Sequence, residues 1–339
     1  IITPRPRTHY DDPTHNLILV GRSVKMNTPF NTMADIGFEA DGEEIQDILD
    51  TEKFDIIHFH EPWVPLLSRQ ILSRSKSINV ATFHAKLPES IISKSIMNTV
   101  IPYTKSILNY IHLFTAVSEA ASEHLRSMTK DEIIIVPNGI DYDKYAQTAK
   151  IPKPDNKKKT ILYLGRLEKR KGVDHLISAY AKLRQSHDDV KLLIAGNGVK
   201  STSLQRMVSQ YEIPDVTFLG FIHDNDKPTL MHSADLFCSP ALYGESFGVV
   251  LLEAMAVYTP IVAGNNTGYS SVMTGRGRLS LVTATQTTDF AQRLELMLYD
   301  NEVRKLWQDW AKKEIIQYNF PNITDKYEQV YKKAMRLYA

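Results

Sequence analysis

Two carboxylates flank a glycine in the segment GESFGVVLLEAM, which spans positions 244 to 255. The residues after Gly248 are almost all apolar, so the pattern predicts a buried helix that begins there. The first amides of a helix lack partners and lie at the positive end of its dipole, so they attract an anion. We therefore expect a diphosphate at this helix start, with Glu245 accepting hydrogen bonds from sugar hydroxyls and Glu253 accepting them from a ribose diol. The alternative is a core helix whose acidic first turn only complements the dipole.

A cluster of cations follows an apolar run in the sequence TILYLGRLEKRKG, positions 160 to 172. The apolar part predicts a strand, and in an open α/β sheet ligands bind beyond the carboxyl ends of the strands. Arg166 offers a planar fork to phosphate oxygens and Lys171 a mobile point charge, so together they are able to neutralise a leaving nucleotide without a metal. A solvated basic loop is the alternative. The Glu-flanked helix start found elsewhere in the chain favours a nucleotide site.

The elements that must position these residues alternate between short apolar runs and helical patterns, as parallel α/β layers require. We expect a first Rossmann-like domain over 1 to 142 and a second over 160 to 318, joined by the polar segment 143 to 159. We also expect residues 319 to 339 to form a helix that returns to the first domain. The predicted strands cover residues 16–20, 55–60, 78–83, 112–117, 133–136, 160–164, 190–195, 216–219, 236–239 and 260–263.

Composition and length limit the classes of function. A chain of 339 residues is long enough for two domains, and a net charge of +1 does not indicate a nucleic-acid binder. The single cysteine, Cys238, excludes an internal disulfide and indicates a reducing compartment such as the cytoplasm. We find no secretory leader and no apolar run of about 20 residues. We therefore expect any membrane contact to be peripheral, on the cytoplasmic face.

The first four residues, IITP, are typical of the end of the second strand of a Rossmann-like domain. We therefore expect that a strand, a glycine loop and a helix, of roughly 30 residues together, would precede Ile1. As a consequence, no phosphate-binding glycines are assigned in the first domain.

His58 and His60 lie two positions apart, so they share one face of a predicted strand. No further carboxylate or cysteine with ligand spacing accompanies them, so we interpret both as structural and expect no metal site. Glu61 follows them at the edge of the first domain, with no role assigned.

Several motifs carry a family resemblance. GRLEKRKG and GESFGVVLLEAM occur with VPNGIDYDKY before them and with LLIAGNG and FLGF between them. Together they resemble the retaining glycosyltransferases of the GT-B fold, in the group of glycogen synthase and the mannosyltransferases. The chain is most similar to bacterial phosphatidylinositol α-mannosyltransferases, through HFHEPWVP at 58 to 65, VATFHA at 80 to 85 and SADLFCSPALYGESFG at 233 to 248. The resemblance covers nearly the whole chain.

This resemblance implies two Rossmann-like parallel-sheet domains that face a central cleft. It also implies metal-free transfer of a hexose from a nucleoside diphosphate sugar, with retention of configuration. Arg166 and Lys171 would stabilise the leaving diphosphate, while Glu245 would bind the sugar and Glu253 the ribose. His84 would lie at the junction of sugar and acceptor. Further donor contacts would come from the helix start, at Ser246, Phe247, Gly248 and Val249.

The segment GFIHDNDK matches positions where the family binds the nucleobase. Ile222 would lie beside the base and offer backbone hydrogen bonds, and Asp224 and Lys227 would contact the base or a phosphate. A carboxylate here suits the paired N–H donors of guanine, which favours GDP over UDP and hence GDP-mannose as the donor. The alternative is a charged surface turn.

The acceptor implied by the resemblance is a hydroxyl group, on a membrane lipid such as phosphatidylinositol. An apolar stripe between residues 87 and 101, with lysines nearby, fits either an interfacial helix or core packing. Two features depart from the family: the acidic segment 41 to 50, which would repel anionic lipid, and Asp35 where a cation is expected. A UDP-sugar-dependent transferase acting on a polysaccharide or a soluble acceptor, a sugar-nucleotide 2-epimerase and a non-catalytic sugar-nucleotide-binding protein therefore remain alternatives. The oligomeric state is not predicted.

Overall fold

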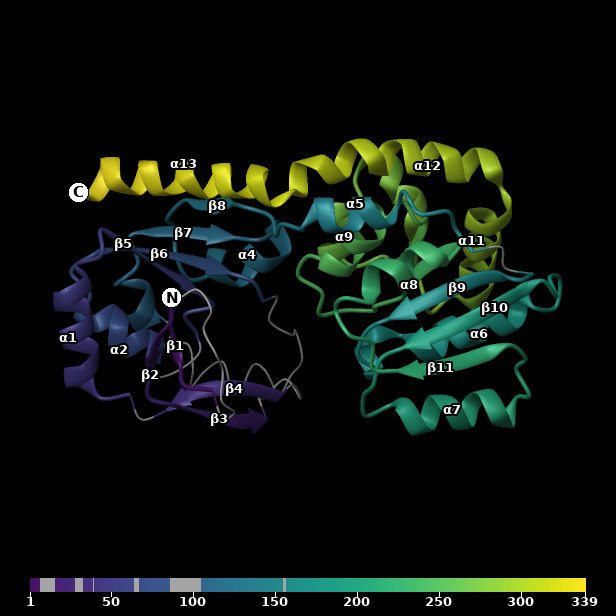
Figure 1. The fold of residues 1–339 in the computed structure, drawn as a ribbon, viewed down its shortest axis with the longest axis horizontal. Helices are drawn as coiled ribbons and strands as arrows, with labels where there is room; N and C mark the ends of the chain where they lie inside the picture. The colour runs from purple at the N-terminus through teal and green to yellow at the C-terminus, as the bar shows by residue number, and fades with distance from the viewer. Residues whose placement is uncertain (7–15, 28–32, 39, 64–66, 86–104, 155–156) are drawn as a thin grey trace. The chain divides into compact units, whose positions relative to one another are not determined.

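Figure 1 shows the computed structural model of the chain, which describes residues 1–6, 16–27, 33–38, 40–63, 67–85, 105–154 and 157–339. The apolar stripe predicted between residues 87 and 101 lies outside the described residues. The chain divides into two compact units. The first comprises Ile1–Val117, Ala121–Val136 and Lys326–Ala339, and the second comprises Ser118–Ala120 and Pro137–Asp325.

The first unit is built on a parallel sheet of four strands, in the order β5 (Ile56–His60), β6 (Ile78–Phe83), β7 (Leu113–Ala116) and β8 (Ile133–Ile135). Every residue of β6 and β7 is buried, which is typical of parallel strands that are covered on both faces. The helices that alternate with these strands along the chain are α1 (Gly42–Glu52), α2 (Leu67–Arg74) and α4 (Glu119–Arg126).

Two small sheets come before the four-stranded sheet in the sequence. Strand β1 (Ile2–Pro4) pairs in parallel with β2 (Ile18–Val20). Strands β3 (Arg22–Asn27) and β4 (Met33–Phe38) pair antiparallel, and they were not predicted. Their sequences, RSVKMN and MADIGF, mix charged and small residues and contain no continuous apolar run, which is the signal on which the strand predictions rested.

The second unit contains a parallel sheet of six strands. Their order is β11 (Val216–Gly220), β10 (Val190–Ala195), β9 (Lys159–Leu164), β12 (Leu236–Ser239), β13 (Ile261–Gly264) and β14 (Leu281–Val282). Figure 1 labels β9, β10 and β11 among them. The order reverses at β9, because β10 and β11 continue on one side of it and β12 to β14 on the other. Ligands bind at such a reversal, outside the carboxyl ends of the strands. The loops after β9 and β12 flank this point, and they carry the predicted cations and Glu245 respectively.

Helices and short 3-10 turns connect the strands of the second unit. Helix α9 (Val249–Ala256) begins directly after Gly248, as predicted, and most of it is buried. The other helices are α5 (Tyr142–Thr148), α6 (Val173–Leu183), α7 (Ser201–Gln210), α8 (Lys227–Ser233), α10 (Thr267–Val272), α11 (Thr287–Tyr299), α12 (Asn301–Glu314) and α13 (Phe320–Tyr338). The 3-10 turns are η1 (Lys169–Lys171), η2 (Gly275–Ser280) and η3 (Ile315–Tyr318).

The predicted α/β class with two parallel-sheet domains is confirmed, and every predicted strand has an observed counterpart. The change of unit falls between Val136 and Pro137, whereas the sequence placed a linker at 143 to 159. That polar segment begins inside α5, where the Asp141 side chain accepts a hydrogen bond from the amide of Lys144 at 3.1 Å. Helix α13 passes from the second unit to the first within its length, and Lys326–Ala339 belongs to the first.

Candidate functional site

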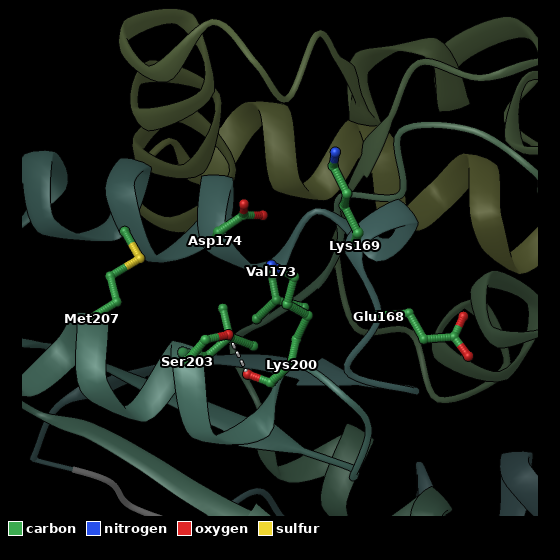
Figure 2. Close-up of a pocket in the computed structure, with 8 residues that line it drawn as sticks. Glu168, Lys169, Val173, Asp174, Lys200, Ser203 and Met207 are labelled. Carbon is green, nitrogen blue, oxygen red and sulfur yellow. Dashed lines mark hydrogen bonds between the residues drawn. The ribbon is translucent and has the colours of Figure 1, made fainter. Parts of the chain in front are cut away.

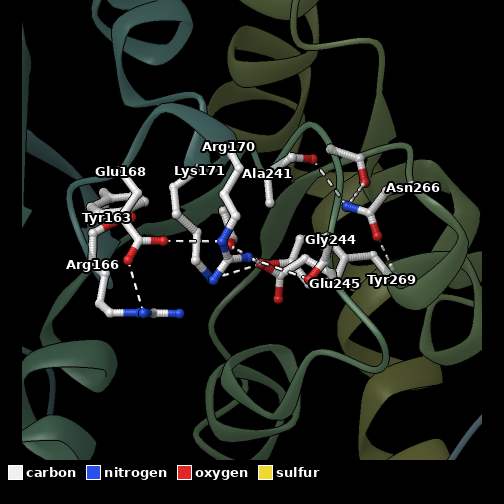
Figure 3. Close-up of polar contacts among 12 residues, drawn as sticks. Tyr163, Arg166, Glu168, Arg170, Lys171, Ala241, Gly244, Glu245, Asn266 and Tyr269 are labelled. Carbon is white, nitrogen blue, oxygen red and sulfur yellow. Dashed lines mark hydrogen bonds and ion pairs between the residues drawn. The ribbon is translucent and has the colours of Figure 1, made fainter. Parts of the chain in front are cut away.

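Two cations converge on one carboxylate oxygen where the strand order of the second sheet reverses (Figure 3). Lys171 Nζ lies 2.7 Å from Glu245 Oε1, and Arg170 Nη1 lies 2.6 Å from the same atom. These side chains are largely withdrawn from water, with exposed fractions of 15% for Lys171, 21% for Arg170 and 12% for Glu245. The cluster therefore holds two positive charges against one negative charge where a diphosphate is expected, and partial burial strengthens its electrostatic effect.

Arg166 belongs to the same network through a second carboxylate. Its Nη1 atom lies 2.8 Å from Glu168 Oε1, and the other oxygen of Glu168 accepts a hydrogen bond from Arg170 Nε at 3.0 Å. Figure 3 shows the Arg166 guanidinium on the Glu168 side of the network, with Arg170 between it and Glu245. The sequence predicted that Arg166 and Lys171 would hold a leaving diphosphate, with Glu245 binding the sugar. In the structure Lys171 contacts Glu245 and Arg166 contacts Glu168, while Arg170, to which we assigned no role, makes the second contact with Glu245.

Close backbone approach fixes the distance between the two loops. The amide of Leu242 donates to the carbonyl of Arg170 at 2.8 Å. Gly172 ends the η1 turn with a φ of 65°, and a Cβ atom there would lie 2.4 Å from the carbonyl oxygen of Pro240. Since no other residue type fits that space and that conformation, the glycine sets the position of its neighbour Lys171 relative to the loop after β12.

Burial and charge act in opposite directions on the two cations. Burial lowers the pKa of the Lys171 ammonium, although the adjacent Glu245 carboxylate opposes this effect. Burial also acts to lower the pKa of Arg170, but the carboxylates of Glu245 and Glu168 outweigh it and the pKa is raised. Arg170 is therefore a permanent cation in the network, and the Glu245 carboxylate favours the charged form of Lys171 against the effect of burial.

The start of α10 supports the loop that carries Glu245. Asn266 Nδ2 donates to the carbonyl of Ala241 at 2.9 Å (Figure 3). A Cβ atom on Gly268 would lie 2.2 Å from the carbonyl oxygen of Glu245, and one on Gly264 would lie 2.1 Å from that of Ala241. We assigned no role to this segment from the sequence. Its signal is the sequence GNNTG directly after a predicted strand, which is typical of a loop that another backbone approaches closely.

The start of α9 follows directly on the loop that carries Glu245. Gly248 precedes the helix with a φ of 109°, and a Cβ atom there would lie 2.7 Å from the ring of Tyr269. The side chain of Phe247 is 3% exposed and packs edge-on against Tyr318, at 5.9 Å between ring centroids. The positive end of the α9 dipole thus follows Glu245 in the chain. The turn between them comprises Ser246, Phe247 and Gly248, and the helix begins at Val249.

Glu253 lies on α9 and is held by a residue of α5. The hydroxyl of Tyr145 donates to Glu253 Oε1 at 2.9 Å. Burial raises the pKa of the Glu253 carboxyl, whereas the charge of Lys227 and the hydrogen bond from Tyr145 lower it. The structure therefore places Glu253 in a partly apolar environment that Lys227 and Tyr145 make tolerable for a carboxylate.

The loop after β11 carries the residues predicted to bind the base. Asp224 Oδ1 lies 2.6 Å from Lys227 Nζ, and the ammonium lowers the pKa of the exposed Asp224 carboxyl. Ile222 is half-buried, and its neighbour Phe221 is 67% exposed. Since Lys227 influences both Asp224 and Glu253, the structure brings the predicted base and ribose residues into one electrostatic neighbourhood.

His84 lies in the first unit, directly after β6. Its amide and that of Ala85 donate to Glu61 Oε2, at 2.7 Å and 3.0 Å. Its Nε2 atom lies 2.8 Å from Nδ1 of His60. Glu61 adopts a left-handed backbone conformation, with a φ of 51°, and burial raises the pKa of its carboxyl. Glu61, which had no assigned role, therefore holds the turn that presents His84.

His58 is enclosed within the first unit. Its ring nitrogens lie 2.7 Å from the Tyr331 hydroxyl and 2.7 Å from Thr82 Oγ1. Burial, followed by the charges of His60 and His84, lowers the pKa of His58 to about 3. Across the described residues, no group of three or more His, Cys, Asp or Glu side chains is arranged to hold a metal ion. Within the same part of the chain, no helix combines the length and the apolar character needed to cross a membrane.

A separate cavity of about 190 Å³ lies against the same loop (Figure 2). Neither Lys171 nor Glu245 lines it, but Glu168 does, so the cavity adjoins the ion network. Both Lys169 and Lys200 contribute to its wall, together with Glu168, Val173, Asp174, Ser203, Leu204 and Met207.

Comparisons with known proteins show the family of the chain. The family model described as "Glycosyl transferases group 1" matches residues 145–314, and the one described as "Glycosyltransferase Family 4" matches residues 1–144. The phosphatidyl-myo-inositol mannosyltransferase of Mycolicibacterium smegmatis is 31% identical over 279 residues, which are 82% of this chain and 71% of that protein. The protein of the same name from Mycobacterium leprae is 30% identical and is covered over 73% of its length, again with 82% of this chain.

Solved structures show a similar fold at low sequence identity. Sucrose-phosphate synthase from Thermosynechococcus elongatus has a TM-score of 0.73 and 19% identity, covering 99% of this chain and 88% of that one. Anabaena HepE, crystallised in complex with UDP, has a TM-score of 0.72 and 17% identity, covering 86% of this chain and 82% of that one.

Proposed function

Because this chain belongs to the glycosyl transferases group 1 family and is therefore a glycosyltransferase, we propose that it transfers mannose from GDP-mannose to a lipid hydroxyl. Phosphatidylinositol is the proposed lipid, and the anomeric configuration of the sugar is retained. The observation that carries the proposal is the convergence of Lys171 and Arg170 on Glu245 where the strand order reverses. The chain is expected to work at the cytoplasmic face of a membrane, as a peripheral protein without a metal.

The proposed chemistry is electrostatic and positional. Negative charge grows on the diphosphate as it leaves the sugar, and Lys171 and Arg166 stabilise that charge together with the positive end of α9. Glu245 lies 2.7 Å from Lys171, so a sugar whose hydroxyls it binds is held next to the departing phosphate. His84 lies at the sugar-acceptor junction in this proposal and contributes to binding.

The proposed donor contacts extend from the phosphates to the base. Glu253 accepts hydrogen bonds from the ribose, and the backbone from Ser246 to Val249 faces the diphosphate. Ile222 lies beside the base, where Asp224 pairs with guanine and Lys227 balances the charges of Asp224 and Glu253. Lys227 is only 24% exposed while it contacts Asp224, which supports an ordered site over a freely solvated turn.

The mannosyl group and the lipid acceptor are supported by the names of the two mycobacterial relatives. A soluble or polysaccharide acceptor is the second candidate, and helix α1 favours it. Glu43 and Glu44 occupy the first turn of α1, and Asp41 caps it. A helix start with this charge disfavours an anionic lipid surface.

A direct assay distinguishes these candidates. The purified chain is incubated with GDP-mannose or UDP-glucose, and with either phosphatidylinositol vesicles or soluble alcohol acceptors. We expect a mannosylated lipid from GDP-mannose with an α-linkage in its NMR spectrum. A product formed only from soluble acceptors or only from UDP-glucose would establish the second candidate. A β-linked product would contradict retention, and the absence of product from every pair would overturn the proposal.

A further inference from the structure

We propose that Tyr145 is a positioning residue for donor binding: its hydroxyl fixes one oxygen of Glu253, so that the carboxylate meets the ribose diol and the chain selects ribonucleotides. The proposal rests on the proposed function of the same site. It adds a residue that neither the sequence motifs nor the family match assigns to the donor.

The contact is short and shielded from water. The Tyr145 hydroxyl lies 2.9 Å from Glu253 Oε1, and the whole residue is only 6% exposed. Helix α5, which carries Tyr145, lies against both α8 and α9. The packing of α5 against α9, the helix that carries Glu253, therefore fixes Tyr145. Its ring cannot swing away without opening this packing.

A single fixed oxygen changes what a carboxylate can do. A free glutamate side chain samples several rotamers and loses that freedom when it binds a ligand. When one oxygen is already bound to a phenol, the carboxylate plane is set before the ligand arrives, and the remaining acceptor positions are directed at the ribose. A ribose diol offers two hydrogen-bond donors. An oriented carboxylate therefore increases the binding affinity of a ribonucleotide more than that of a nucleotide that lacks both hydroxyls.

The same bond affects the charge of Glu253. Burial raises the pKa of the carboxyl, and the donated hydrogen bond from Tyr145 acts against this rise. Burial, the charge of Glu253 and the bond to it raise the pKa of the Tyr145 phenol, so the phenol keeps its proton and remains a donor. Tyr145 thus favours the ionised form of Glu253, which is the stronger acceptor for a hydroxyl group.

A second tyrosine of α5 provides a matched control. The hydroxyl of Tyr142 lies 2.7 Å from that of Tyr258. This bond also joins α5 to the rest of the second unit, but it does not involve Glu253. If α5 only needed to be docked, loss of either phenol would have the same effect on nucleotide binding.

The test is calorimetric titration of GDP and of 2′,3′-dideoxy-GDP, with UDP and its dideoxy counterpart in parallel, into wild type, Tyr145→Phe and Tyr142→Phe. We expect Tyr145→Phe to weaken binding of the ribonucleotide about fivefold, because the lost hydrogen bond no longer orients Glu253 toward the ribose hydroxyls. The affinity for the dideoxynucleotide should stay unchanged, because this ligand lacks those hydroxyls. Tyr142→Phe should leave the ratio of the two affinities at the wild-type value.

Each result has a separate meaning. If wild type prefers the ribonucleotide and Tyr145→Phe keeps the full preference, the role of Tyr145 is overturned while the donor site stands. If wild type binds both nucleotides equally, this result contradicts both the ribose contact of Glu253 and the role of Tyr145. If wild type binds no nucleoside diphosphate, the proposed function itself fails. The Glu253→Ala background gives an independent check, because it removes the acceptor of the Tyr145 hydroxyl, and Tyr145→Phe should have no further effect on the ratio there.

Discussion

Lys171 Nζ lies 2.7 Å from Glu245 Oε1 although the two residues follow different strands, β9 and β12. These strands are neighbours in the sheet, with Leu162 opposite Phe237 in their register. Parallel neighbours bring their carboxyl ends to one edge, so the pairing of β9 with β12 is the reason that a lysine and a glutamate far apart in sequence meet. This edge is also where the order of the strands reverses.

Lys171→Ala should lower kcat/KM at least about 100-fold, as expected when a charge that stabilises a transition state is removed. The free energy of unfolding should change by less than about 1 kcal/mol, because Arg170 still pairs with Glu245 in the variant. Lys169→Ala is the matched control, since Lys169 belongs to the same turn but lines the separate cavity. Wild-type kinetics from Lys171→Ala, or an equal loss from Lys169→Ala, would contradict the assignment.

Arg166 and Arg170 should differ in their effect on stability. Arg170→Ala leaves two partly buried carboxylates without their shared partner, so we expect the free energy of unfolding to fall by about 1–2 kcal/mol. Arg166 is 51% exposed, and Arg166→Ala should change stability by no more than about 0.5 kcal/mol. Both variants should lose turnover. Urea denaturation beside an activity assay separates the two effects, and equal stability of the variants would refute the bridging role of Arg170.

Gly268→Ala tests the contact behind Glu245. The added Cβ atom would lie 2.2 Å from the backbone carbonyl oxygen of Glu245, and relieving this clash requires a shift of the main chain, so we expect a loss of about 1–3 kcal/mol in the free energy of unfolding. Gly42→Ala is the control. Its Cβ atom would approach only the end of the flexible Arg74 side chain, at 2.5 Å, and that side chain is able to shift. A Gly268→Ala protein as stable as Gly42→Ala would show that the loops are not in close contact.

His58 should make the fold sensitive to acid. Its pKa is lowered from 6.5 to about 3, so between these values the unfolded chain binds a proton that the folded chain does not. Stability therefore falls as the pH drops below 6.5, by at most about 2 kcal/mol from this residue at pH 5. Denaturation of wild type and His58→Gln at pH 7.5 and pH 5 measures this contribution. The variant should lose less stability on acidification, and an identical loss in both proteins would exclude His58 as the cause.

The sequence predicted those parts of the fold that depend on apolar periodicity. Strands such as β6 and β12 are short, wholly buried and mostly apolar, so an apolar run in the sequence identifies them. The start of α9 after Gly248 was predicted for the same reason, from an apolar run behind a glycine. The β3–β4 hairpin was missed because its pairing does not depend on an apolar run in either strand.

The site was harder to predict than the fold, because its contacts depend on the register of the loops. Arg166, Lys169, Arg170 and Lys171 have similar chemistry, and residue type cannot distinguish which cation reaches Glu245. The turn of η1 decides this, since it directs Arg170 and Lys171 toward Glu245 and leaves Arg166 at Glu168. Tyr145 was missed for a different reason. It lies in a segment whose polar composition suggested a linker, yet its hydroxyl donates a hydrogen bond to Glu253.

The most direct test of the cation site is the contribution of the second phosphate to nucleotide affinity. Calorimetry compares GDP with GMP, and UDP with UMP, in wild type and in Lys171→Ala. If Lys171 and its neighbours hold a diphosphate, wild type should prefer the diphosphate at least about tenfold, and Lys171→Ala should lose most of that preference while its affinity for the monophosphate stays nearly unchanged. An undiminished preference for the diphosphate in Lys171→Ala would contradict the central claim.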